Sequence, residues 1–146
     1  MHDHRWGFTL LELLVTLAII GVVLSLAIPS WKTFQIHLQA KLITERIIES
    51  LSYARIEALL TNQAIQIKPI NNNYQNGWEI IRDKDILSIY PPSPVSITNI
   101  QLSRRNIITF QPSGLSEGSN GSFVINNHYK VTLNRGGRAY YERILP

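Results

Sequence analysis

Few residues in this chain are spaced as a catalytic or metal site requires. Residues 114–118 read GLSEG, and their letters match the G-x-S-x-G nucleophile motif around Ser116. That motif needs a strand before the serine and a helix after it, whereas the turn sequence SNG follows here. The histidines show no metal-ligand spacing among themselves or with the carboxylates. They are His2, His4, His37 and His128. We therefore expect no enzymatic activity, no cofactor and no metal site.

One charged residue is notable because its neighbours are apolar. Residues 7–29 read GFTLLELLVTLAIIGVVLSLAIP, and Glu12 is the single ionisable side chain among them. As a helix, residues 8–28 would span roughly 30 Å, about the hydrocarbon thickness of a bilayer. A carboxylate inside such a helix costs roughly a few kcal/mol and is rarely left without a partner. The alternative is a tolerated interfacial glutamate near the helix end.

Length and charge distribution indicate one globular domain with a basic tail. The chain has 146 residues, no cysteine and a net charge of +4. Without cysteine, it can form neither disulfides nor thiolate metal sites. Residues 8–103 carry seven Lys/Arg and seven Asp/Glu, whereas residues 104–146 carry six Lys/Arg against two Glu. Such an asymmetry indicates either a basic face for an anionic partner or an ordinary solvated surface.

The first seven residues do not look like an ordinary secretory signal. The apolar run behind them is longer than the usual ~7–15 residues, and no A-x-A-like site follows it. The small residue, Gly7, precedes the run, so cleavage there would leave the apolar helix on the product. Arg5 and the α-amino group weakly favour a cytoplasmic N-terminus.

A single long helix is predicted from about residue 8 to residue 60. Pro29 lies at the end of the apolar run and should kink the helix without necessarily ending it, because it removes a backbone donor. Residues 29–61 then form an amphipathic continuation, with Lys41 and Glu45 as an i,i+4 pair on the polar face. The predicted apolar stripe consists of Phe34, Leu38, Leu42, Ile43, Ile47, Leu51, Ala54 and Ala58.

Residues 62–146 show the period-two pattern of a β-rich domain. Seven β-branched or aromatic runs alternate with turn sequences and are interpreted as strands. These runs are residues 64–68, 78–82, 86–90, 95–100, 107–111, 122–126 and 129–134. Because no helix is available for parallel crossovers, the sheet should be mostly antiparallel, and residues 122–134 form the clearest hairpin. Packing the amphipathic helix on this sheet gives an α+β fold.

The start of the apolar run resembles the class III signal of type IV pilins and pseudopilins. It reads G-F-T-L-L-E-L at residues 7–13. The resemblance implies that a prepilin peptidase removes residues 1–7 as a leader by cutting between Gly7 and Phe8. It also implies that Phe8 is then N-methylated and that Glu12 governs assembly. Residues 8–28 would form a transmembrane helix that later enters the filament core.

Shorter motifs along the rest of the chain resemble the GspH/FimT minor pseudopilins. They are SYARIEALLTNQAIQI at 52–67, Gly77-Trp78, ITFQPSG at 108–114 and Gly136-Gly137-Arg138. The resemblance implies a pilin-like fold and a single-pass inner-membrane subunit, with its N-terminus cytoplasmic and its globular domain periplasmic, that enters a periplasmic or surface filament. The implied partners are the prepilin peptidase, other major and minor (pseudo)pilins, the inner-membrane assembly platform and membrane lipid.

A filament gives Glu12 a physical role. Cleavage before Phe8 creates a cationic α-amine, and in a bundle of parallel helices the carboxylate of an incoming subunit can meet the amine of its neighbour. In apolar surroundings this pair is worth more than in water, and an unpaired carboxylate is penalised. Glu12 would therefore set the stagger between subunits.

Two functions follow from these readings. The first is a minor pseudopilin of a type II secretion pseudopilus, which takes part in protein export across the outer membrane. The second is a FimT-like minor type IV pilin that binds DNA for natural transformation. Its phosphate contacts would be Lys130, Arg135, Arg138 and Arg143, with Tyr129, Tyr140 and Tyr141 available to stack on bases.

The tail departs from the DNA-binding relatives at one position. Those relatives read G-R-x-R, whereas Tyr140 stands here where the second arginine would be. Arg135 and Arg143 could compensate for that loss. The competing interpretation is that the tyrosines pack on the sheet and the arginines keep the domain soluble.

Overall fold

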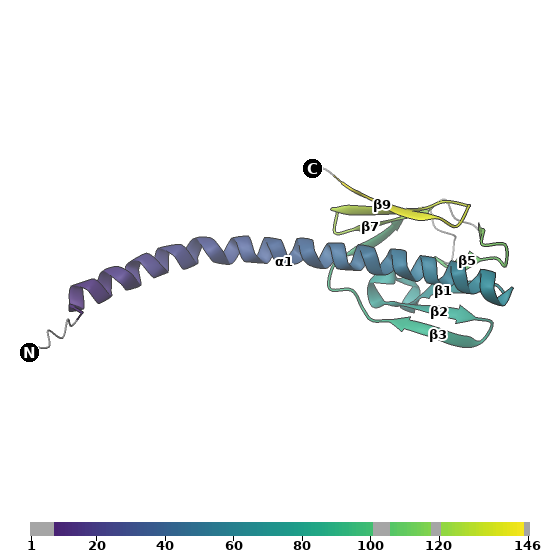
Figure 1. Ribbon diagram of the computed structural model, residues 1–146, viewed down its shortest axis with the longest axis horizontal. Coiled ribbons are helices and arrows are strands. Elements are labelled where there is room, and N and C mark those ends of the chain that lie inside the picture. Colours follow the sequence, from purple (N-terminus) through teal and green to yellow (C-terminus); the bar gives the residue numbers. More distant parts are fainter. Residues whose placement is uncertain (1–7, 101–105, 118–120, 145–146) are drawn as a thin grey trace, which may run out of the picture. The chain divides into compact units, whose positions relative to one another are not determined.

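The computed structural model describes residues 8–100, 106–117 and 121–144, without the side chains of residues 26–30. Within these residues, one long helix precedes nine short strands (Figure 1). The chain divides into two compact units, Met1–Ile36 and His37–Pro146, and the helix contributes to both.

Helix α1 runs from Leu10 to Thr61, which confirms the predicted long helix. It continues through residue 29, and the expected kink at Pro29 falls where side chains lie outside the described residues. At the other end, Thr61 Oγ1 donates to the carbonyl oxygen of Glu57 at 2.7 Å, and Asn62 takes a left-handed conformation with φ 53°. A left-handed asparagine directly after the last turn is a common way to end a helix.

The predicted apolar stripe is buried only in its second part. Ile43, Ile47 and Leu51 lie in the core, whereas Phe34, Leu38 and Leu42 are exposed. Successive helical residues are about 100° apart, so Leu38 and Leu42 project nearly opposite to Ala40 and Ile47. The stripe was therefore wrong for its first three residues, because it joined two different faces. The i,i+4 pair of Lys41 and Glu45 forms as predicted, with 3.8 Å between Nζ and Oε1.

The strands form two antiparallel sheets instead of one. The first sheet has the order β3-β2-β1-β5-β6. Its strands are β1 (Ile65–Pro69), β2 (Trp78–Arg82), β3 (Asp85–Tyr90), β5 (Ile108–Phe110) and β6 (Ser116–Glu117). The second has the order β4-β7-β8-β9. Its strands are β4 (Ile97–Ile100), β7 (Gly121–Ile125), β8 (Tyr129–Leu133) and β9 (Ala139–Arg143). Every neighbouring pair is antiparallel.

All seven predicted strands are present, and two others were missed. β6 has only two residues, and β9 is exposed at most of its positions, so neither shows an alternating apolar pattern. The second sheet arises where residues 91–96 carry the chain from β3 to β4. This segment is fixed to the first half of the domain because the Ser93 N–H donates to the carbonyl oxygen of Gln75 at 2.8 Å.

The hairpin of β7 and β8 is confirmed, with a turn that depends on two asparagines. Asn126 and Asn127 have φ values of 47° and 55°, and the His128 N–H donates to the carbonyl oxygen of Ile125 at 2.9 Å. Positive φ at both central positions is what a primed type I turn requires, and asparagine tolerates it well.

One hydrophobic core joins the second half of α1 to both sheets. Figure 1 shows this half of the helix running along the strands of the globular unit. Tyr74 is the polar centre of the core, since its ring meets Phe123 edge to face at 4.8 Å and its hydroxyl donates to the carbonyl oxygen of Asn106 at 2.8 Å. Burial raises the pKa of the Tyr74 hydroxyl well above its ordinary value.

Candidate assembly and nucleic-acid interfaces

The first turn of α1 places Glu12 at a defined capping position. Thr9 precedes the helix, and its Oγ1 accepts a hydrogen bond from the Glu12 N–H at 3.2 Å. Thr9 is therefore the N-cap and Glu12 is the third helical residue, which is the T-x-x-E arrangement of a capping box. A carboxylate in the first turn also complements the partial positive charge of the helix N-terminus. Sequence reasoning missed this local role, although the motif displays it.

The side chains around Glu12 are apolar and unburied in the single chain. Every described side chain between residues 8 and 36 is exposed, with Phe8 at 83% and Leu17 at 57%. The Glu12 carboxylate forms no ion pair with any described residue. An exposed apolar surface of this extent is typical of a segment that other molecules cover. The leader and Gly7 lie outside the described residues, and the predicted cleavage there stays a prediction.

In the part of the chain that the structure describes, no helix is both long enough and apolar enough to cross a membrane. The transmembrane role of residues 8–28 stays a prediction.

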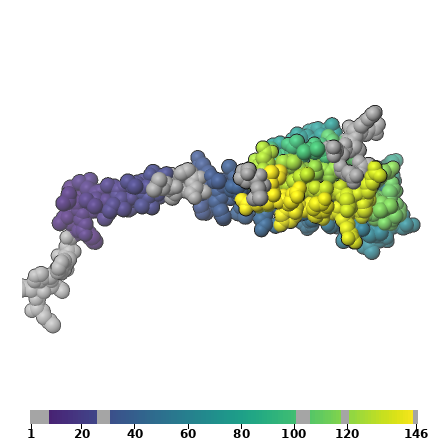
Figure 2. All heavy atoms as spheres, turned by 90° about the horizontal axis from the view of Figure 1, so that it is seen from above, coloured from purple at the N-terminus to yellow at the C-terminus, as the bar shows by residue number. Residues whose placement is uncertain are grey.

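The turn between β8 and β9 presents two of the four predicted basic residues. Asn134 closes the turn, because its Oδ1 accepts from the Arg138 N–H at 3.0 Å and its carbonyl oxygen accepts from the Gly137 N–H at 3.0 Å. Arg135 and Arg138 are exposed, and neither forms an ion pair with a described residue. This hairpin, coloured yellow, covers much of the face seen in Figure 2.

The other two basic residues lie on different faces of the second sheet. Lys130 is opposite Glu142 in the β8–β9 register, and their Nζ and Oε1 atoms are 3.6 Å apart. Arg143 is opposite Tyr129, one position along, so its side chain projects from the other face. The four cations therefore do not form one patch.

The tyrosines are divided in the same way. Tyr129 and Tyr141 share a face and meet edge to face at 6.1 Å, whereas Tyr140 projects with Lys130 from the opposite face. The two exposed tyrosines of β9 therefore do not make a continuous stacking surface with Tyr129.

Three of the short motifs converge at one corner of the globular unit. Arg55, from the helix, donates through Nε to the carbonyl oxygen of Gly114 at 3.1 Å. Gly137 lies against the same carbonyl: a Cβ at this position would be 2.2 Å from the oxygen. Its φ of 71° independently favours glycine. The motifs around residues 52–67, 108–114 and 136–138 thus share one structural role, which is to dock two turns on the helix.

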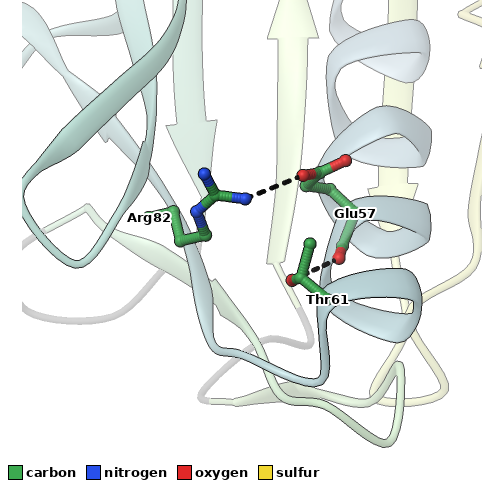
Figure 3. A network of polar contacts seen from close by, with 3 residues as sticks. All are labelled: Glu57, Thr61 and Arg82. Atoms are coloured by element: carbon green, nitrogen blue, oxygen red, sulfur yellow. Dashed lines mark hydrogen bonds and ion pairs between the residues drawn. The ribbon is translucent and has the colours of Figure 1, made fainter.

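A second polar contact lies at the C-terminal end of α1 (Figure 3). Arg82 Nη1 in β2 is 3.2 Å from Glu57 Oε1, and both side chains are partly buried. Beside Arg82 is a polar cavity of about 410 Å³, lined by residues such as Gln63, Gln66 and Gln111. Its lining contains no cluster of ionisable groups with an obvious catalytic arrangement.

Ser116, the central residue of the G-x-S-x-G sequence, has a structural role in the fold. Ser116 is buried in β6, and its Oγ donates to the carbonyl oxygen of Asn134 at 2.8 Å. Among the described residues, no group of three or more His, Cys, Asp or Glu side chains is placed to hold a metal ion.

Comparison with known proteins gives two family matches and a shared fold. The model described as "Type II transport protein GspH" matches residues 44–137, and that described as "Prokaryotic N-terminal methylation motif" matches residues 7–28. No curated protein sequence is a significant match.

Two crystal structures of the Pseudomonas aeruginosa type IV minor pilin FimU have a similar fold. The form in space group P21 has a TM-score of 0.61 and 18% identity, covering 75% of this chain and 92% of that chain. The form in space group P65 has a TM-score of 0.56 and 19% identity, covering 68% and 89%.

A long N-terminal helix that begins with a methylation motif and leads into antiparallel sheets defines a pilin-like subunit. Since the GspH match covers more than half of the sequence, the chain belongs to the GspH family, as a GspH/FimT-like minor pilin or pseudopilin. The predicted fold class and the resemblance are both confirmed.

Proposed function

We propose that this protein is a minor structural subunit of a type II secretion pseudopilus and that Glu12 controls its incorporation. The family's description as a type II transport protein supports the choice of machine. The observation that carries the assembly role is the apolar, exposed surface of residues 8–25, which surrounds one carboxylate without an ion-pair partner in the described chain.

Processing precedes assembly in this proposal. The prepilin peptidase cuts between Gly7 and Phe8, and Phe8 is methylated, in keeping with the methylation motif at residues 7–28. Residues 8–28 hold the subunit in the inner membrane, with the globular domain on the periplasmic side. The assembly platform then transfers the helix from lipid to a bundle formed with other pseudopilins.

The free energy of this transfer explains why one charge matters. Lipid and a helix bundle are both apolar, so leucines and valines gain little from the exchange. A carboxylate gains more, because in the bundle it meets the α-amine of a neighbouring subunit in surroundings of low dielectric constant. Glu12 thereby favours one stagger over the many that apolar packing permits.

The first turn allows the charge of Glu12 to be separated from its capping role. Glu12→Gln keeps the T-x-x-E/Q capping pattern but removes the charge. Thr9→Ala removes the N-cap, at a cost of roughly 1 kcal/mol, and keeps the charge. In a strain that lacks the native gene, we expect Glu12→Gln to reach the membrane normally but to lose incorporation and secretion at least tenfold, whereas Thr9→Ala retains both.

Normal secretion by the Glu12→Gln variant would contradict the assembly role. The machine is tested by deletion of the gene: loss of secretion with intact surface pili supports a secretion pseudopilus. Loss of surface pili with intact secretion would assign the subunit to a type IV pilus instead.

DNA binding is the second candidate, and one observation favours it. Arg135 and Arg138 are exposed on a turn that Asn134 holds rigid, and they are not paired with described carboxylates. Two guanidinium groups on a turn with a fixed backbone suit contacts with backbone phosphates. Because Lys130 and Arg143 lie on opposite faces, this candidate rests on the turn more than on the whole tail.

A gel-shift titration of the detergent-solubilised full chain tests this candidate. Phosphate binding predicts an affinity that falls steeply with salt, and Arg138→Ala should lower the salt slope by about 1. Lys84→Ala, which removes an exposed charge from the β2–β3 turn, is the matched control. No shift at low salt, or equal weakening by both substitutions, would exclude a site at the β8–β9 turn.

A further inference from the structure

Two histidines that are far apart in the sequence meet in the globular unit. His37 is on α1 and His128 is in the turn between β7 and β8, and their ring centroids are 4.2 Å apart at an interplanar angle of 79°. Both side chains are half-buried. Their sequence spacing gives no sign of this pairing, because the fold brings the two elements together.

The turn favours one tautomer of His128. Its Nδ1 lies against the carbonyl oxygen of Asn126, which can only accept, so the proton is assigned to Nδ1 and the lone pair to Nε2. The backbone of the turn is held in place, since the Asn126 N–H donates to the carbonyl oxygen of Ser96 at 2.9 Å. An imidazole whose Nδ1–H is bound to a backbone carbonyl is in the usual state of a metal-ligating histidine.

His37 also has ring nitrogens available. None of the hydrogen bonds between described side chains uses them. The nearest charged residue along the helix on the same side is Lys41, one turn further on, which is itself close to Glu45. The two imidazoles are thus the bases that this site offers to a cation.

The spacing of the rings suits a shared metal ion. With a metal–nitrogen distance of about 2.0–2.1 Å, a ring centre lies roughly 3.2 Å from the metal. Two such rings at a right angle about the metal have centres roughly 4.5 Å apart, near the observed 4.2 Å. A right angle between imidazole nitrogens suits copper and nickel ions, which favour square-planar or tetragonal sites.

We propose that His37 and His128 form a two-imidazole site for a divalent transition-metal ion, with water completing the coordination. The ion would join α1 to the β7–β8 hairpin one turn before Ala40, the first buried residue of the helix. It would thereby stabilise the position at which the helix enters the core. This site is independent of the proposed filament function, because neither histidine belongs to residues 8–28.

Copper binding to the detergent-solubilised full chain tests the proposal. His2 and His4 also offer imidazoles, so the reference protein carries His2→Ala and His4→Ala. We expect one Cu²⁺ per reference chain, an electron paramagnetic resonance spectrum with splitting from two nitrogen ligands, and at least a tenfold loss of affinity on either His37→Gln or His128→Gln. Ni²⁺ at 100-fold excess over its Kd should raise the Tm of the globular unit by on the order of 5–10 °C.

The controls make each outcome decisive. The change in tryptophan fluorescence on unfolding, to which the buried Trp78 contributes, verifies that each variant is folded. Binding that disappears with His2 and His4, or that persists unchanged in folded His37→Gln and His128→Gln variants, would overturn the proposal. A spectrum from one nitrogen ligand in the reference chain would do so as well.

Discussion

The two halves of α1 are both rich in apolar residues, but their exposure in the single chain is opposite. Leu17, in the first half, is 57% exposed, whereas Leu51, in the second half, is 2% exposed. The second half has one apolar face, and the sheets of the same chain cover it. The first half is apolar on all sides, as is usual for a helix in a membrane or at the centre of a larger assembly. The chain therefore stabilises one half itself and leaves the other for different molecules.

The comparison also separates two kinds of information in the sequence. At the start of the chain, the proposed assembly role depends on residue types at a fixed spacing: Gly7, Phe8, Thr9 and Glu12. In the globular unit, the fold depends on close contacts, such as those between Arg55, Gly114 and Gly137.

The largest expected effect separates the two halves directly. Leu51→Ala should lower the free energy of unfolding of the globular unit by about 2–5 kcal/mol, because it leaves a cavity in the core. Leu17→Ala should change it by less than about 0.5 kcal/mol, because this side chain has no partner in the chain. Urea titrations followed by the fluorescence of buried Trp78 measure both. Equal effects would contradict the division into two halves.

Substitutions at two glycines also distinguish the globular unit from the first half of α1. Gly137→Ala should destabilise the globular unit by about 1–3 kcal/mol through its positive φ alone, with the contact to the Gly114 oxygen adding to that cost. Gly21→Ala meets nothing within 4 Å and should favour the helix by roughly 0.5–1 kcal/mol. Thermal unfolding and helical circular dichroism are the measurements. A Gly137→Ala variant as stable as the native chain would show that the corner does not constrain the fold.

A pH effect is expected from the core of the globular unit. Burial raises the pKa of Tyr74 in the folded state above its unfolded value of about 10. Its contribution to stability is therefore complete below pH 10 and is lost as pH rises further, by about 1.4 kcal/mol per pH unit. Tyr74→Phe should flatten the alkaline part of the stability curve, although it removes the hydrogen bond to Asn106 at every pH. An unchanged alkaline slope in this variant would assign the effect to another group.

The smallest effect concerns the two ion pairs of α1. Glu57→Gln breaks the partly buried contact with Arg82 and should cost up to about 1 kcal/mol, whereas Glu45→Gln breaks an exposed i,i+4 pair worth about 0.3–0.5 kcal/mol. Urea titration in low and high salt compares them, and the exposed pair should be the more sensitive to salt. A larger loss of stability in Glu45→Gln than in Glu57→Gln would show that burial does not strengthen the Glu57–Arg82 pair.

Much of the fold could be predicted because its signals are local. The helix from Leu10 to Thr61 follows from an unbroken apolar pattern, and the β7–β8 turn follows from two adjacent asparagines. Leu38 and Leu42 were placed on the wrong face because a spacing of four residues does not say which face of the helix is buried. β9 was missed because an edge strand needs no buried alternation.

The candidate sites also differ in how far the sequence predicts them. Phe8 and Glu12 follow from a contiguous motif within residues 7–28, which the methylation-motif model matches, and the roles of the two residues stay predictions. The distribution of Lys130 and Arg143 depends on the register between β8 and β9, which sequence does not specify. The meeting of His37 and His128 depends on how the helix packs on the second sheet, so it also required the structure.

The central claim is that the apolar first half of α1 remains on the mature subunit as a working part. The mass of the chain isolated from its native membrane or filament tests this claim most directly. We predict a chain that begins at Phe8 and carries one additional methyl group at its N-terminus. A chain that begins at Met1, or one that begins after residue 28 because the apolar run has been removed, would contradict it.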